Sequence, residues 1–553
     1  MGSFIFKMIN FKKTKSICLS SVIIFLMGCG SQKETVKKYV RPNIIFIMSD
    51  DHAYQAISAY QDNLIATPNI DRIAEQGMLF SNACVTNSIC APSRATILTG
   101  KHTHLNGKID NRLPFDTTNI TFPILFQQAG YQTAMFGKLH FGNNPKGIDD
   151  FLILPGQGNY INPDFITPRG DTTIIGYVTD IITDLTLSWL NQKRDPEKPF
   201  MLMYMHKAPH RPWWPRADKF KEYSKMNFPV PSTLFDDYKG RGSAAKKAEM
   251  NVLYDMKYGH DSKIRPETIV EMGSVMPKVP PMNWDGVDGF YQNYNRANDE
   301  QKALYDPIID SINNEFRKYW PSMSREEKMR WKYQRYMQDY LGTIASIDDN
   351  LGRLLDYLKE TGLDQNTMII YTSDQGFYLG EHGWFDKRFI YNESFKTPLL
   401  IKWPEHIAPG SKNDEMVQNL DFAQTLLDVA GIKAPMDMQG ESLLPLLRGE
   451  DKWNREAVYY HYYEYPAVHM VKRHYGIISK TYKLVHFYYD VDEWELYDRM
   501  KDPSELNNVY KDPAYTSIVA RLKLELKDLR IKYQDSEVLD QQFIDVYRDN
   551  GWL

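Results

Sequence analysis

Cysteine is scarce in this sequence, and so are long apolar runs and blocks of one charge. Only four cysteines occur among 553 residues, which excludes a small scaffold built on disulfides. The apolar run of residues 17–27 is too short to cross a bilayer by itself. The formal net charge is −4 and no basic block stands out, which argues against nucleic acid as the main partner.

What remains is the composition of an ordinary globular protein. Hydrophobic residues make up 42% of the chain and charged residues 25%. At 553 residues the chain exceeds the size at which one hydrophobic core usually stops growing, so we expect two domains or subdomains.

The first 41 residues have the pattern of an export signal followed by a tether. Four lysines between residues 7 and 15 precede the apolar run, which is the order of a secretory signal. The run ends in Leu-Met-Gly-Cys, which resembles a bacterial lipobox. That resemblance implies a signal peptide over 1–29, lipidation of Cys29 and a polar tether over 30–41. The implied location is the periplasm or cell surface, with an outer-membrane lipid anchor as the only membrane contact. The alternative is a plain cleaved signal peptide.

Apolar runs alternate with helical patterns between residues 42 and 449, which predicts an α/β fold. Continuous β-branched runs predict strands that are buried on both faces; these cover 43–48, 132–136, 199–205, 367–372 and 398–403. Helical spacing and end signals predict helices; these cover 68–76, 122–128, 178–190, 325–360 (one helix or two) and 421–429. Such alternation predicts a mostly parallel sheet covered by helices on both faces.

Two stretches depart from this alternation. Residues 211–323 are rich in Pro, Trp, Tyr and charge and have weak periodicity, so we expect an insertion over the active-site edge. After Gly449, short alternating aromatic segments predict a smaller antiparallel sheet, with a final helix near 515–533. The expected organisation is a catalytic domain over 42–449 and an α+β subdomain over 450–553.

Polar residues directly follow two of the expected strands. Asp50 and Asp51 come after the first strand, and Asp374 and Gln375 after the fourth. In an open α/β sheet, ligands bind at the carboxyl ends of the strands. Oxygen ligands of this kind suit a hard cation, Ca²⁺ in particular, and without a histidine cluster zinc is less favoured. The alternative is that these residues are helix caps and loop carboxylates.

Cys90 stands one step before an expected helix. Pro92 suits the first helical position, and Gly100 suits the left-handed position just past the end. A side chain at position 90 would therefore lie over a helix N-terminus, where backbone N–H groups and the helix dipole favour an anion. Two other interpretations stay open: a buried structural cysteine, and a disulfide with Cys84.

The segment 90–94 (Cys-Ala-Pro-Ser-Arg), followed by Leu-Thr-Gly at 98–100, resembles the signature of the type I, formylglycine-dependent sulfatases. The resemblance implies an alkaline-phosphatase-like fold. It also implies a maturation enzyme that oxidises Cys90 to formylglycine (3-oxoalanine), whose hydrate is the nucleophile. Further parts of the family pattern recur from about residue 42 to residue 500.

The same resemblance implies roles for residues at the strand ends. One Ca²⁺ is the implied metal, and its implied ligands are Asp50, Asp51, Asp374, Gln375 and the formylglycine at 90. Many relatives have Asn where this chain has Gln375. The residues that resemble the sulfate-gripping set of the family are Lys138 and His140 (Gly-Lys-Leu-His), His210 (Ala-Pro-His) and Lys387 (Asp-Lys-Arg).

The implied reaction is hydrolysis of a sulfate monoester. The cation and the two lysines neutralise charge on the sulfate oxygens. His210, together with Lys387, protonates the leaving oxygen, and His140 takes the proton whose loss from the hydrate expels sulfate. Arg94 holds the hydrate and the metal shell in place, whereas His206 is expected to be structural.

Three further segments, 206–213, 380–389 and 469–476, together resemble the N-acetylglucosamine-6-sulfatase branch. This implies an exo-acting enzyme on sulfated oligosaccharides. It would remove the 6-O-sulfate of terminal N-acetylglucosamine or N-sulfoglucosamine in heparin or heparan sulfate, or in mucin- or keratan-type glycans. The residues expected to grip the sugar are Asp386, Arg388, His461 and His469.

Two rival functions remain. A phosphomonoesterase or phosphodiesterase on the same scaffold would use Thr or Ser as nucleophile and usually two zinc ions, so Cys90 with Arg94 argues against it. A non-catalytic glycan-binding surface lipoprotein would fit if Cys90 is never oxidised.

Overall fold

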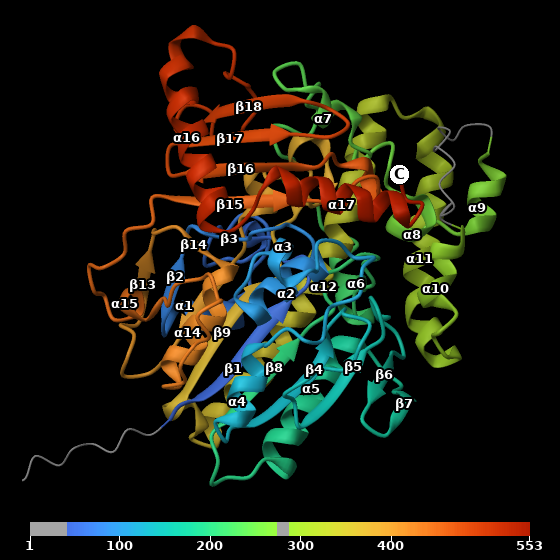
Figure 1. Cartoon of the computed structure of the whole chain (residues 1–553). Helices are drawn as coiled ribbons and strands as arrows, with labels where there is room; N and C mark the ends of the chain where they lie inside the picture. Colours follow the sequence, from blue (N-terminus) through green and yellow to red (C-terminus); the bar gives the residue numbers. More distant parts are fainter. Residues whose placement is uncertain (1–40, 274–286) are drawn as a thin grey trace, which may run out of the picture. The chain divides into compact units, whose positions relative to one another are not determined.

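A ten-stranded sheet organises the computed structural model, which describes residues 41–273 and 287–553. The strand order is β13-β2-β12-β9-β1-β8-β4-β5-β6-β7. The four central strands, which lie side by side in Figure 1, are all parallel. They are β9 (Thr367–Ser373), β1 (Asn43–Ser49), β8 (Phe200–Met205) and β4 (Gln132–Lys138). Their sequences are nearly continuous apolar runs because both faces of the sheet are covered.

The outer strands make the sheet mixed. β5 (Asp150–Leu154) is parallel to β4, and β13 (Ser411–Asn413) is parallel to β2 (Met78–Phe80). β6 (Asp164–Thr167) and β12 (Leu399–Lys402) run against the central strands, and β7 (Gly170–Thr173) pairs antiparallel with β6. The predicted mostly parallel sheet is confirmed. The direction of β12 was not visible because an apolar run carries no information about strand orientation.

Helices cover both faces, as the alternation predicted. Ile45 and Ile47 of β1 belong to a core that takes in α1 (Pro68–Glu75), α5 (Val178–Ser188) and α12 (Arg325–Glu360). The alternate residues Phe46 and Met48 belong to a second core on the other face. Its helices are α2 (Cys90–Thr99), α4 (Phe122–Gln128) and α14 (Phe422–Val429).

The predicted helix over 325–360 is a single helix, α12. Its start is fixed by a capping box, in which the Ser324 side chain accepts from the Glu327 backbone N–H and the Glu327 carboxylate accepts from that of Ser324. A run of buried residues along α12 packs it on the sheet and on α1 and α5.

Where the structure describes it, the segment 211–323 consists of α-helices joined by irregular stretches. Its helices are α6 (Ala217–Tyr223), α7 (Ser243–Lys247), α8 (Tyr258–Ser262), α9 (Pro266–Glu271), α10 (Val287–Tyr294) and α11 (Asp299–Tyr319). α6 and α8 pack on α12. Most of these helices are one or two turns long, which is too short to establish a period. The longer α11 does bury Tyr305, Ile309, Ile312 and Phe316 at helical spacing, a period that the sequence analysis missed.

A four-stranded antiparallel sheet follows residue 456, as predicted. It consists of β15 (Ala457–Tyr462), β16 (His474–Ser479), β17 (Tyr482–Phe487) and β18 (Glu493–Asp498). α16 (Thr516–Lys532) packs on it, close to the predicted helix (Figure 1). The expectation that this helix is the last one is wrong, because α17 (Glu537–Asp549) follows. The domain boundary at residue 449 stays a prediction.

The predicted signal peptide (1–29) and the predicted tether up to residue 40 lie outside the described residues. Within the described part of the chain, no helix combines the length and the apolar character that crossing a membrane requires.

One glycine next to the sheet edge gives a test of the fold. Gly137 in β4 has φ +109°, and a Cβ there would lie 1.8 Å from the carbonyl oxygen of Met205. We expect Gly137→Ala to lower the free energy of unfolding by about 3 kcal/mol, measured by urea titration. Gly130→Ala is the matched control, because Gly130 also has positive φ (+85°) but has open space around it, so about 1 kcal/mol is expected. Equal losses in the two variants would contradict the close approach of β4 and β8.

Candidate active site

The carboxyl ends of β1 and β9 bring four polar residues together. Ser49 pairs with Ser373 in the strand register, so the residues that follow each strand are neighbours. The Asp51 backbone N–H donates to Asp374 Oδ1 at 3.1 Å, and Gln375 Nε2 donates to Asp374 Oδ1 at 2.8 Å. One oxygen from each of Asp50, Asp51 and Asp374 lies within 4.8 Å of the others. All three carboxylates are fully buried.

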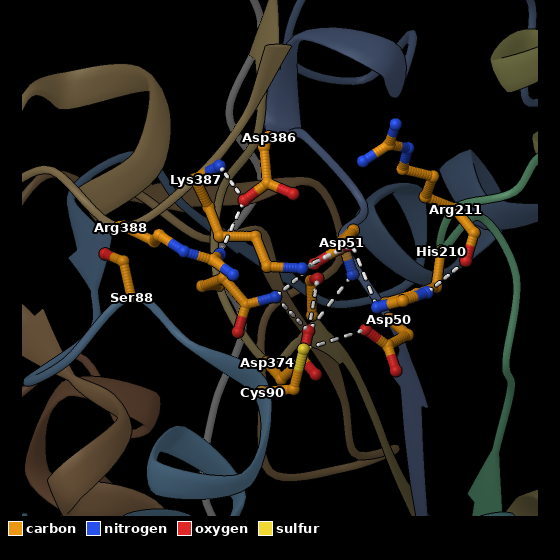
Figure 2. A network of polar contacts seen from close by, with 12 residues as sticks. Asp50, Asp51, Ser88, Cys90, His210, Arg211, Asp374, Asp386, Lys387 and Arg388 are labelled. Carbon is orange, nitrogen blue, oxygen red and sulfur yellow. Dashed lines mark hydrogen bonds and ion pairs between the residues drawn. The ribbon is translucent and has the colours of Figure 1, made fainter. Parts of the chain in front are cut away.

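Cys90 is the first residue of α2, whereas we expected it just before the helix. Pro92, expected at the first helical position, is the third residue. Gly100 ends the helix in the left-handed conformation, as predicted (φ 62°). The Cys90 thiol is 1% exposed and donates to Asp50 Oδ1 at 3.6 Å. Figure 2 shows the thiol directed at this carboxylate.

The two cysteines of the described chain have different surroundings. Cys84 packs in an apolar cluster and donates to the carbonyl oxygen of Val417 at 3.2 Å. Both thiols are free, so the alternative of a Cys84–Cys90 disulfide is wrong. Burial and the Asp50 carboxylate raise the pKa of Cys90, which keeps its thiol protonated. Since the thiolate is the nucleophilic form, unmodified Cys90 is a poor nucleophile.

Three cationic side chains surround the carboxylates. Arg94 donates to Asp374 Oδ2 at 2.9 Å and to Asp50 Oδ2 at 3.1 Å, and Lys138 forms an ion pair with Asp50. Lys387 Nζ lies 2.7 Å from both oxygens of Asp51. Burial opposes ionisation of Asp50, but Lys138 and Arg94 hold its pKa well below the usual value.

Burial has the larger effect at the other two carboxylates. Burial raises the pKa of Asp51 to about 7 despite Lys387, with Asp50 and Asp374 adding to the rise. Burial and Asp50 also raise the pKa of Asp374. The side-chain oxygen of Gln375 is buried without a hydrogen-bond partner. A buried cluster of carboxylate oxygens with an orphaned amide oxygen fits a hard divalent cation.

Lys138 and His140 lie at the end of β4. Lys138 Nζ contacts the side-chain oxygen of Gln157 as well as Asp50. His140 Nδ1 is buried without a hydrogen-bond partner. Burial and the charge of Lys138 lower the pKa of His140 well below its usual value, so its ring is neutral and can accept a proton.

His210 follows β8 and faces the same cluster. Its Nδ1 lies 2.5 Å from the carbonyl oxygen of Arg211, and its Nε2 lies 3.8 Å from Asp51 Oδ2. Burial and Lys138 lower the pKa of His210 well below its usual value. Because a carbonyl can only accept, the ring proton of neutral His210 resides on Nδ1, which leaves Nε2 as an acceptor.

Residues 386–388 link this cluster to a second polar group. Arg388 Nη1 donates to Asp386 Oδ1 at 2.7 Å, and His469 Nε2 lies 3.3 Å from Asp386 Oδ2. Lys387 extends in the opposite direction, toward Asp51 (Figure 2). The structure therefore brings three of the four expected sugar-gripping residues together, next to the carboxylate cluster.

His461 does not join this group. Its Nδ1 lies 2.9 Å from Asp535, and its Nε2 lies 2.7 Å from the Tyr488 hydroxyl. Its ring also stacks on Tyr463. These partners belong to the interior of the C-terminal subdomain, so the structure provides no support for a sugar contact by His461.

Backbone strain concentrates at these residues. Non-glycine residues seldom adopt positive φ, and such strain persists where the surrounding structure enforces it, as at active sites. The site residues with positive φ are Asp51 (67°), His140 (69°), Asp386 (76°), Arg388 (91°) and His469 (67°).

Sequence reasoning missed three residues near the site. The Tyr160 hydroxyl donates to the carbonyl oxygen of His210 at 2.7 Å. Asn111 Oδ1 accepts from the backbone N–H of Ala91, next to Cys90. Lys207, buried at the end of β8, stands in the segment Lys-Ala-Pro-His, and its position after a strand was the available signal. His206 is buried against Tyr204, in agreement with a structural role.

The chain is similar to known proteins over most of its length. The family model described as Sulfatase matches residues 42–432, and the model described as N-sulphoglucosamine sulphohydrolase, C-terminal, matches residues 380–532. The chain is 45% identical over 530 residues to an N-acetylglucosamine-6-O-sulfatase of Bacteroides thetaiotaomicron, covering 94% of this chain and 92% of that one. It is 27% identical over 455 residues to human N-acetylglucosamine-6-sulfatase, covering 77% and 68%.

Solved structures of other proteins have a similar fold. One, of a relative in complex with its substrate D-glucosamine-2-N,6-O-disulfate, has a TM-score of 0.84 and 45% identity, covering 90% of this chain and 99% of that one. A phosphonate monoester hydrolase of Agrobacterium radiobacter has a TM-score of 0.62 at 21% identity, covering 89% and 96%, and so shares the fold.

Proposed function

The chain belongs to the sulfatase family, and we propose that it is an exo-acting 6-O-sulfatase of glucosamine. The proposed substrate is terminal N-acetylglucosamine or N-sulfoglucosamine 6-O-sulfate in heparin or heparan sulfate. One observation carries the proposal: residue 90 faces three buried carboxylates and two lysines, and the group Asp386, Arg388 and His469 adjoins them. Similarity to the 45% identical N-acetylglucosamine-6-O-sulfatase supports the choice of sugar and position.

We propose that Ca²⁺ binds at the carboxylate cluster. The residues that would hold it are Asp50, Asp51, Asp374, Gln375 and residue 90. The bound cation would supply positive charge to the sulfate oxygens and to the oxygen of residue 90. Arg94, which contacts two of these carboxylates, keeps them in place.

We propose that a maturation enzyme oxidises Cys90 to formylglycine, whose hydrate supplies the oxygen that attacks sulfur. Support comes from the place of Cys90, whose thiol donates to Asp50 at 3.6 Å beside the proposed cation site, and from the sulfatase-like signature around it. Lys138, at the end of β4, and Lys387, from a separate segment of the chain, stabilise the charge that spreads over the sulfate oxygens.

Two histidines have suitable positions for proton transfer. Neutral His140, with an unpartnered Nδ1, can accept the proton that residue 90 loses when sulfate departs. His210 can donate from Nε2 only as a protonated ring. Because its pKa is low in the free site, that role requires the negative charge of a bound sulfate ester to raise it.

The group Asp386, Arg388 and His469 is suited to sugar hydroxyls. Burial opposes ionisation of Asp386, but Arg388 and Lys387 hold its pKa well below the usual value. Ionised Asp386 therefore accepts hydrogen bonds and Arg388 donates them, which matches hydroxyl groups that do both.

We further propose that the enzyme acts in the periplasm or at the cell surface, anchored by lipidated Cys29.

A panel of size-defined heparan and mucin-type oligosaccharides, each with a single sulfate at O2, O3, O6 or N, tests the substrate. We expect release of sulfate from O6 only, and faster release from heparan than from mucin-type sugars. Release from any other position would contradict the proposed specificity, and faster release from mucin-type sugars would contradict the proposed glycan.

Asp386→Asn should lower kcat/KM about 10-fold to 100-fold, since it removes a charged acceptor.

A further inference from the structure

Lys207 lies at the centre of the sheet edge that forms the site. β8 runs between β1 and β4, and Met205 at its end pairs with Met48 on one side and Gly137 on the other. Lys207 comes two residues later, between Asp50, which follows β1, and Lys138, the last residue of β4. The Asp50 backbone N–H donates to the carbonyl oxygen of Ala208 at 3.2 Å, which fixes this arrangement.

The Lys207 ammonium is buried without a hydrogen-bond acceptor. The residue is 1% exposed, and among the described residues no oxygen accepts from its Nζ. Its contact is with the ring of Tyr160, whose centre lies 4.7 Å from Nζ. A buried ammonium without an acceptor is costly, and a single ring contact offsets only part of that cost.

Lys332 shows how this chain satisfies a buried lysine that is purely structural. Its Nζ also lies over a tyrosine ring, 4.2 Å from the centre of Tyr258. Unlike Lys207, it donates to two backbone carbonyl oxygens, those of Leu253 and Met256, at 2.7 Å each. The ammonium of Lys207, which adjoins the sulfate-binding residues, lacks such acceptors.

We propose that Lys207 is a catalytic residue whose Nζ donates a hydrogen bond to an oxygen of the sulfate group, alongside Lys138 and Lys387. The inference rests on the proposed function. Its chemistry is a charge-assisted hydrogen bond that strengthens as negative charge accumulates on the sulfate oxygens, with no bond to Lys207 formed or broken. Burial and the charge of Lys138 lower the pKa of Lys207 to about 7 in the free site, and an anionic oxygen beside it would raise that pKa.

The variants Lys207→Met and Lys332→Met form a matched pair, since each removes a buried ammonium that lies over a tyrosine ring. We expect Lys207→Met to lower kcat/KM about 100-fold. Its inhibition constant for inorganic sulfate should rise about 10-fold. Lys332→Met should lower the thermal midpoint and leave both constants, per folded enzyme, within about threefold of wild type. Lys207→Arg should recover part of the loss because it restores a positive charge.

A purely structural Lys207 would give a different result. Lys207→Met would then lose stability but keep the wild-type kcat/KM and the wild-type inhibition by sulfate, which would overturn the proposal. If Lys207→Met does not fold, a crystal structure of the wild-type enzyme with inorganic sulfate shows whether Lys207 Nζ contacts the sulfate. Nζ within about 3.2 Å of a sulfate oxygen supports the proposal, and Nζ beyond about 4 Å from all of them contradicts it.

The two proposals can fail separately. If the wild-type enzyme releases sulfate from a position other than O6, the proposed specificity fails. The comparison of Lys207→Met with wild type can still be made on that substrate and with inorganic sulfate. If O6 is the position released and Lys207→Met behaves as wild type, only the role of Lys207 fails.

Discussion

Cys90→Ala should abolish sulfate release and leave the fold intact. Residue 90 is the only predicted nucleophile, and the neighbouring charged groups cannot replace its oxygen. We expect kcat/KM to fall by at least about 10⁴-fold, the scale seen when a nucleophile is removed. Sulfate release from a 6-O-sulfated glucosamine, together with circular dichroism and thermal unfolding, measures both parts of the prediction.

Cys84→Ala is the control. This second buried thiol lies in an apolar cluster, away from the carboxylates. Its removal should cost about 1–2 kcal/mol of stability and leave kcat/KM within about threefold. Full activity in Cys90→Ala would overturn the assignment of the nucleophile.

Asp51→Asn should remove the bound divalent cation and nearly all activity. Asn keeps the shape of Asp51 but loses the charge that contacts Lys387 and completes the cluster of three carboxylates. We expect the metal content of the purified protein to fall from about one ion per chain to near zero. We also expect kcat/KM to fall at least about 10³-fold. Elemental analysis measures the metal without reference to activity.

A second buried cluster provides the control for Asp51. His461, Asp535 and Asp540 offer three possible ligand atoms within 4.8 Å, and burial raises the pKa of Asp540 to about 7, as it does for Asp51. There, both ring nitrogens of His461 already have partners, Asp535 and the Tyr488 hydroxyl, and Arg530 lies 2.6 Å from Asp540. Asp540→Asn should therefore keep the metal and the activity. A full complement of metal in Asp51→Asn would refute the proposed site.

Much of the fold was predictable because buried strands and helices require apolar residues in a recognisable pattern. β1 and β9 are covered on both faces, so their apolar runs stand out. α17 was missed because few of its residues are buried, Ile544 and Tyr547 among them. The short helices of 211–323 were missed for a related reason, since one or two turns are too few to establish a period.

The site was predictable where topology alone brings residues together. Asp50 and Asp374 follow adjacent parallel strands, so the strand-end rule places them side by side. Lys387 depended on resemblance, because a charged triplet indicates a solvated turn and its burial cannot be read from the sequence. Lys207 was missed although its position after a strand was a signal, because the burial of its side chain cannot be read from the sequence either. The prediction that His461 grips the sugar stays a prediction, because a His- and Tyr-rich strand does not reveal which of its faces meets the ligand.

The measurement that tests the account most directly is the specific activity as a function of the fraction of residue 90 present as aldehyde. Mass spectrometry of the tryptic peptide that contains residue 90 gives this fraction for protein made with and without the maturation enzyme. We predict that activity is proportional to the aldehyde fraction and vanishes with the thiol. Full activity in protein that carries only the Cys90 thiol would contradict the account.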